Sequence, residues 1–94
     1  MPYLLIRHTV ENYSAWRPAF DDHASIREAA GCLGGQLFHV ADDRTEVVVL
    51  FEWDSLENAR AFAESADLAE RMRWVGVVGD PEFTFLEKLS DVPV

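Results

Sequence analysis

A histidine and an arginine interrupt the aromatic face of the helix predicted from AWRPAFDDHASIR, residues 15–27. At about 100° per residue, one narrow arc of this helix carries Trp16, Phe20, His23 and Arg27, with Tyr13 beside them. Two interpretations follow. Either His23 is a hydrogen-bonded core residue and Arg27 reaches solvent at the helix end, or both face a cleft and bind the oxygen atoms of a ligand.

If the arc is buried, the group that neutralises the charge of Arg27 distinguishes the two interpretations. A guanidinium removed from water is strongly destabilising unless a carboxylate or a bound anion neutralises it. The predicted strands offer two carboxylates, Glu52 and Glu87. A partner of this kind would make Arg27 structural.

His8 is the expected companion of His23. Side chains alternate along a strand, so His8 and Arg7 point to opposite faces of the strand predicted over residues 3–10. If the even-numbered face meets the helices, His8 approaches His23; if the odd-numbered face does, Arg7 takes its place. Two histidines beside a bound phenol would exchange protons near neutral pH. The alternative is a structural histidine at a strand end.

Aromatic side chains could form the walls of an apolar pocket. The candidates that would contact a substrate are Trp16, Phe20, Phe62 and Trp74, although aromatics at helical spacing also pack as plain core. Trp53 is expected in packing or an interface. His39 alternates with Leu37 and Gly35 and is expected on the side of the sheet that faces a second subunit.

Metal and cofactor motifs are missing from the sequence. His8, His23 and His39 lack the short spacings typical of metal ligands, so no metal site is predicted. No G-x-S-x-G motif or glycine-rich phosphate loop occurs, which argues against a hydrolytic triad and a bound nucleotide or flavin. The single cysteine, Cys32, excludes an intrachain disulfide and is expected to be a small buried or hinge residue.

The elements alternate in the order β-α-β-β-α-β. Strands are predicted over residues 3–10, 33–41, 46–53 and 82–89, and helices over 13–30 and from 54 onward, with a break near 65–67. A short helix then turns Leu68, Met72 and Val75 inward, and residues 79–81 make a turn.

The predicted helix ends rest on capping residues. Asn12 caps the first helix, Gly31 ends it, and Pro18 marks the end of an irregular first turn. Asp54 and Glu57 form a capping box at the second helix.

This order predicts an α+β, ferredoxin-like single domain over residues 1–94, with both helices on one face of a four-stranded antiparallel sheet. Several strands are apolar on both sides, as in Leu5 with Ile6 and Val48 with Val49. The helices cover one face only, so the other is expected to pair sheet to sheet in a homodimer.

Composition excludes several partners. The 94 residues carry a formal net charge of −9, which argues against nucleic acid and anionic membranes because both need clustered Lys and Arg. No stretch approaches the length of a transmembrane helix, and the N-terminus lacks the features of a signal peptide. A soluble, cytoplasmic protein is expected.

Two stretches carry a family resemblance. RHTVENYSAWRPAFDDHASIREAAG and VVVLFEWDSLENARAF resemble the dimeric α/β-barrel superfamily, closest to the small proteins grouped with antibiotic biosynthesis monooxygenases. The resemblance covers residues 3–89 and implies a homodimer with a ligand cleft between helices and sheet in each subunit. Haem-degrading members have a histidine on the second helix, and residues 55–75 contain none.

The predicted function follows from this resemblance and the residues together. It is a small-molecule enzyme resembling cofactor-independent monooxygenases or polyketide cyclases, acting on an aromatic, oxygen-bearing substrate. His23 and His8 would handle protons, and Arg27 would stabilise an enolate or phenolate. The alternative is a non-catalytic homodimer of the same fold that binds a small metabolite.

Overall fold

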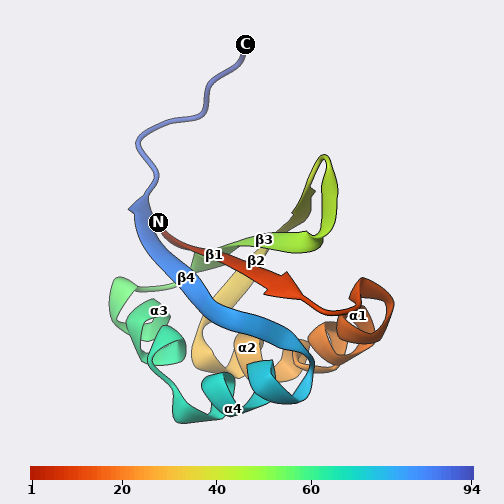
Figure 1. Cartoon of the computed structure of the whole chain (residues 1–94). Helices are drawn as coiled ribbons and strands as arrows, with labels where there is room; N and C mark the ends of the chain where they lie inside the picture. The colour runs from red at the N-terminus through yellow and green to blue at the C-terminus, as the bar shows by residue number, and fades with distance from the viewer.

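Four antiparallel strands form one sheet in the order β2-β3-β1-β4, and Figure 1 shows all the helices on one side of it. The computed structural model describes all 94 residues. The elements are β1 (Pro2–Val10), α1 (Tyr13–Asp22), α2 (Ala24–Ala30), β2 (Cys32–Val40), β3 (Asp43–Trp53), α3 (Leu56–Ala63), α4 (Ala66–Trp74) and β4 (Val77–Glu87). The prediction of an α+β ferredoxin-like fold is confirmed.

Strand β1 turns its even-numbered side chains toward the helices. Leu4, Ile6, His8 and Val10 are all buried, while Arg7 is exposed on the opposite face and pairs with Glu46 at 2.9 Å. Of the two residues that the sequence allowed on the helix side, His8 lies there and Arg7 does not. The helix-facing core is apolar except for this one imidazole.

The predicted helix over residues 13–30 is two helices that meet at His23. Pro18 lies inside regular α1, so the prediction of an irregular first turn ending there is wrong. The break lies five residues later, at His23, where φ is −86° and ψ is −1° instead of the α-helical value of about −42°. The carbonyl of Phe20 accepts from the backbone N–H of His23 at 3.2 Å and also from Nη1 of Arg27 at 2.9 Å, so Arg27 adds a second hydrogen bond across the junction.

Helix ends agree with the sequence at three places and differ at one. Asn12 caps α1, Gly31 ends α2 with a left-handed φ of 113°, and a break precedes α4, as predicted. The predicted capping box is wrong by one residue. Ser55 caps α3 by accepting from the backbone N–H of Asn58 at 3.0 Å, and Asp54 accepts from the Asn58 side chain instead.

Strand β4 begins earlier than the prediction of 82–89, and the predicted turn at 79–81 is a bulge inside it. Arg7 pairs with Glu82 and Thr9 with Val78, so residues 79–81 lie opposite His8 alone. Gly79 supplies the positive φ of 70° that this bulge requires. The irregular part of the sheet is therefore next to the buried histidine.

The outer face of the sheet has no helix over it (Figure 1). Its apolar side chains, which we call the outer sheet patch, are Leu5, Phe38, Val48, Leu50 and Leu86. Phe38 is 51% exposed and Leu86 is 39% exposed. Polar pairs such as Tyr3–Glu52 and Arg7–Glu46 stand beside this patch.

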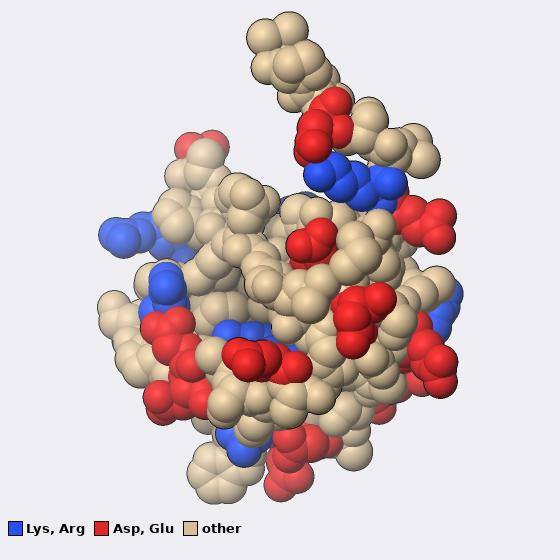
Figure 2. Space-filling view, turned by 180° about the vertical axis from the view of Figure 1, so that it is seen from behind, with Lys and Arg blue, Asp and Glu red and all other residues tan.

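Charged residues are scattered over the surface. Figure 2 shows acidic and basic side chains interspersed over one side of the molecule. No helix is long and apolar enough to cross a membrane.

The position of the α3 cap can be tested by mutation. Ser55→Ala should lower the free energy of unfolding by about 1 kcal/mol, because the N–H of Asn58 loses its acceptor. Asp54→Ala should have a smaller effect, since it removes only an exposed side-chain bond. Urea denaturation of both variants measures the difference, and a larger loss in Asp54→Ala would restore the predicted capping box.

Candidate active site

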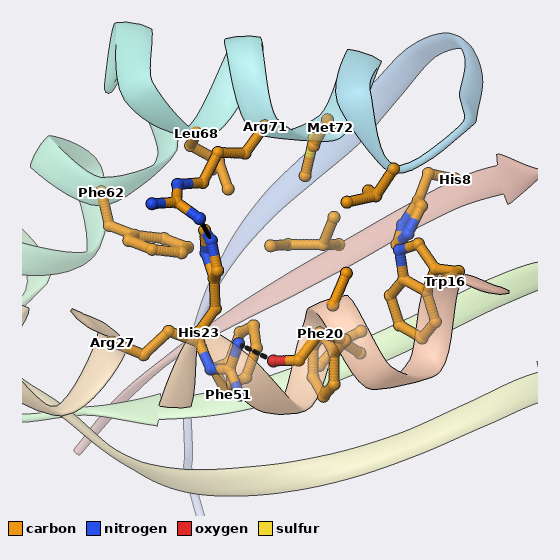
Figure 3. A pocket seen from close by; sticks show the side chains of 14 residues that line it. His8, Trp16, Phe20, His23, Arg27, Phe51, Phe62, Leu68, Arg71 and Met72 are labelled. Atoms are coloured by element: carbon orange, nitrogen blue, oxygen red, sulfur yellow. Dashed lines mark hydrogen bonds between the residues drawn. The ribbon is translucent and has the colours of Figure 1, made fainter. Parts of the chain in front are cut away.

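A cavity of about 60 Å³ lies between the sheet and side chains of all four helices (Figure 3). Six of the seven predicted site residues line it: His8, Trp16, Phe20, His23, Arg27 and Phe62. Pockets that hold small molecules usually span ~300–1,000 Å³. In this conformation the cavity therefore admits only a small group or one edge of a larger ligand.

Trp74 is the predicted residue that the cavity lacks. It is 83% exposed on the surface of α4, so its placement in the cleft is wrong. The inward side of α4 carries Leu68 and Met72, one turn apart, as the sequence predicted. Trp74 does not share that helical phase.

His8 is a buried imidazole without a partner. It is 5% exposed, and neither ring nitrogen has a hydrogen bond. Its ring lies 5.4 Å from that of Trp16, centroid to centroid. Burial lowers the pKa of His8 from 6.5 to about 4, so the ring is neutral at physiological pH and offers one N–H and one lone pair. No protein group satisfies either nitrogen, so both are available to hydrogen-bond a polar group that enters the cavity.

A continuous layer of aromatic rings forms the wall beside His8. Trp16 stacks on Phe20 at 4.7 Å, Phe20 on Phe51 at 6.0 Å, and Phe51 meets Phe62 edge-on at 6.3 Å. Trp53 packs behind Phe62 and is fully buried, which confirms a packing role. The wall suits a flat apolar ligand.

Arg27 has no acidic partner, contrary to the expected pairing with Glu52 or Glu87. Glu52 lies on the outer face, where it accepts from the hydroxyl of Tyr3 at 3.2 Å, and Glu87 is exposed at the end of β4. The Arg27 guanidinium instead stacks over Phe20 at 4.2 Å and Phe51 at 5.3 Å. Burial lowers its pKa, and no carboxylate forms a salt bridge with it.

His23 stands at the junction of α1 and α2, and its Nε2 contacts the Arg71 guanidinium. Burial, then the charges of Arg71 and Arg27, lower the pKa of His23, which favours a neutral ring that accepts from Arg71. Figure 3 shows His8 and His23 at separate sides of the cavity. They line one cavity but form no hydrogen-bonded pair.

Sequence reasoning missed Arg71 and Phe51 as lining residues. Arg71 precedes Met72 on the inward side of α4, and Phe51 alternates with the buried Val49 on β3, so both had a periodic signal. Neither signal identifies a site by itself.

His39 and Cys32, whose positions the sequence also predicts, lie outside the cavity. His39 pairs in register with Val47, on the helix side of the sheet, so its expected place on the outer face is wrong. It is exposed there, with Nδ1 2.8 Å from the carbonyl oxygen of Val40. Cys32 is buried and free, as predicted, and burial raises the pKa of its thiol. No group of three or more His, Cys, Asp or Glu side chains could hold a metal ion.

These features define a ferredoxin-like α+β domain with an aromatic cavity under the sheet and a neutral histidine inside it. The family model described as antibiotic biosynthesis monooxygenase matches residues 5–74, about three quarters of the chain. The chain belongs to this family. It matches none of the curated proteins with which it was compared.

Solved structures share the fold at low sequence identity. SnoaB, a cofactor-independent oxygenase from Streptomyces nogalater, has a TM-score of 0.76 at 13% identity over 99% of this chain and 97% of its own. A Bordetella bronchiseptica protein provisionally named an antibiotic biosynthesis monooxygenase has a TM-score of 0.78 at 17% identity, covering 95% and 97%. Rv0793 from Mycobacterium tuberculosis has a TM-score of 0.67 at 21% sequence identity. The match covers 97% of this chain and 98% of Rv0793. At these identities the likeness shows the fold.

The buried neutral state of His8 predicts a pH effect on stability. The unfolded chain takes up a proton near pH 6.5, while folded His8 does so only near 4, so this contribution is complete above about pH 6.5 and declines below it. Between pH 7 and 4.5 the wild type should lose about 2 kcal/mol more than His8→Phe. Urea denaturation at both pH values measures this difference. Equal losses in the two proteins would contradict a neutral, buried His8.

Proposed function

We propose that this protein is a small-molecule oxygenase, independent of any cofactor, that removes a proton from a hydroxylated aromatic substrate through His8. The observation that supports the proposal is a buried, neutral imidazole whose two nitrogens lack partners inside an aromatic cavity. Family membership and the fold shared with SnoaB agree with this reaction class. A cytoplasmic location fits such an enzyme.

The proposed chemistry begins with transfer of a phenolic or enolic proton to the lone pair of His8. Arg27 stabilises the resulting oxyanion, because its charge has no protein counter-ion. The electron-rich ring then reacts with dioxygen, one atom of which enters the ring while the other leaves as water. A phenol and one dioxygen thus give one quinone and one water. His23 can accept or return a proton at the other side of the cavity.

One related activity, cyclisation, uses the same first step. A substrate whose enolate attacks its own carbonyl would be cyclised without dioxygen, as in a polyketide cyclase. The small volume of about 60 Å³ favours a second function class, a non-catalytic homodimer that binds a small metabolite. Oxygen consumption separates the oxygenase from both.

Oxygen-electrode assays with a panel of hydroxylated naphthalenes and anthrones test the oxygenase. The wild type should consume one dioxygen per substrate oxidised, and His8→Phe should lower the rate about 100-fold or more because the proton acceptor is lost. His39→Gln changes an exposed histidine outside the cavity and serves as the matched control. A wild type that binds these compounds without consuming oxygen would support the binding protein or the cyclase.

We also propose that two copies pair through their outer sheet patches. An apolar patch of this kind, flanked by polar residues, is typical of a protein interface. The family resemblance implies the same arrangement.

Phe38→Asp should convert the dimer to a monomer, because it would place two carboxylates in an apolar interface. Ile26→Asp, on the exposed side of α2, should leave the dimer intact. Analytical ultracentrifugation gives the mass of each, and a Phe38→Asp variant that stays dimeric would exclude this face.

A further inference from the structure

A second hollow, with a volume of about 430 Å³, lies at the surface between α1 and α4. We call it the outer hollow. Four residues line both this hollow and the inner cavity: Ala19, His23, Arg71 and Val75. These residues therefore form a partition between the surface and the cavity that contains His8.

The partition contains one polar contact. Arg71 reaches from α4 toward the junction of α1 and α2, where its guanidinium contacts Nε2 of His23 (Figure 3). No other side-chain hydrogen bond or salt bridge joins α4 to α1 or α2. Ala19 and Val75 contribute only short apolar side chains. The closure of the partition therefore depends on the side chains of Arg71 and His23.

Arg71 can leave this position without any movement of the backbone. Its side chain is 46% exposed, and its Nε lies 3.5 Å from a carboxylate oxygen of Asp67, one turn earlier on α4. Asp22 and Glu70 also line the outer hollow, so a guanidinium that turns outward meets carboxylates and water there. Exposed side chains change rotamer within picoseconds to nanoseconds. The rotation exchanges the contact with His23 for other polar contacts.

The other boundaries of the cavity are apolar. Phe20 belongs to the boundary toward β2, and Phe62 belongs to the boundary toward α3. Leu68 and Met72 separate the cavity from a small hollow beside β4. Turning any of these side chains outward would expose apolar surface to water, which is unfavourable. Turning Arg71 outward hydrates a charged group that is already half in solvent.

We infer that the contact between Arg71 and His23 is a latch that shuts the inner cavity, and that ligands reach His8 between α1 and α4 when Arg71 turns outward. While the latch is shut, Arg71 occupies the lone pair of His23. The proton-accepting role proposed for His23 is therefore available only when the latch is open. The inference goes beyond the proposed function, because an oxygenase, a cyclase and a binding protein would all need this entrance.

Chemical modification of His8 tests the latch without a substrate. Diethyl pyrocarbonate transfers an ethoxycarbonyl group to neutral imidazoles, and mass spectrometry of the peptides gives a separate rate for each histidine. A minor open state is typically populated at about 0.1–10%, so Arg71→Ala should raise the rate at His8 at least about fivefold. The rate at His39, which is exposed outside the cavity, should not change.

Two controls separate the latch from a general loosening of the fold. Arg73→Ala removes the other arginine in the last turn of α4, which is exposed and does not line the cavity, so the rate at His8 should stay at the wild-type value. In every protein the rate at His8 is expressed relative to the rate at which Ellman's reagent modifies the buried thiol of Cys32. Unfolding of the whole chain cancels in this ratio.

Arg71→Met distinguishes the polar contact from simple bulk. Methionine keeps a long side chain but has no N–H donor for His23, so this variant should also raise the relative rate at His8. A relative rate that Arg71→Ala leaves unchanged, or that Arg73→Ala raises equally, overturns the latch. A rise in Arg71→Ala without one in Arg71→Met overturns it as well, since bulk alone would then shut the cavity. None of these rates depends on oxygen uptake, so the latch and the oxygenase can fail separately.

Discussion

The hydrogen bond from Arg27 to the carbonyl of Phe20 links α1 and α2, the two helices that meet at His23. The same side chain lays its guanidinium over the rings of Phe20 and Phe51. It also lines the cavity. The link across the helix junction and one wall of the cavity therefore depend on one charged residue that forms no salt bridge.

His8 owes its properties to the strand that carries it. Alternation along β1 places it among Leu4, Ile6 and Val10, where no polar group reaches its ring nitrogens. The resulting desolvation holds the imidazole neutral, with a pKa of about 4. A base of this kind is a weak acceptor in water but is effective where the conjugate oxyanion is stabilised nearby, which is the part assigned to Arg27. In the proposed reaction the two residues act on one ligand without contacting each other.

The sequence predicts the fold class, the inward face of β1 as one of two choices, and six residues of the cavity lining out of seven proposed for the site, because period-2 and period-3.6 patterns report burial directly. It failed where geometry depends on tertiary contacts. The break at His23 and the absence of a salt bridge to Arg27 have no local signal. Trp74 has the residue type of a pocket wall but not the helical phase of the inward side of α4, so its predicted place is wrong. The shift of the α3 cap from Asp54 to Ser55 is within the usual uncertainty of helix ends.

The bulge at Gly79–Pro81 constrains how this sequence can change in length. Opposite it, β1 advances by two residues from Arg7 to Thr9 while β4 covers four from Val78 to Glu82, so both strands keep their inward and outward sides across the irregularity. Removing or adding one residue there would exchange the inward and outward side chains of β4 on one side of the bulge. Either Phe83 and Phe85 or Val77 would then point away from the helices. Insertions and deletions in this segment are compatible with the core only in pairs, and the parity of the bulge is therefore under stronger constraint than the identity of its exposed residues.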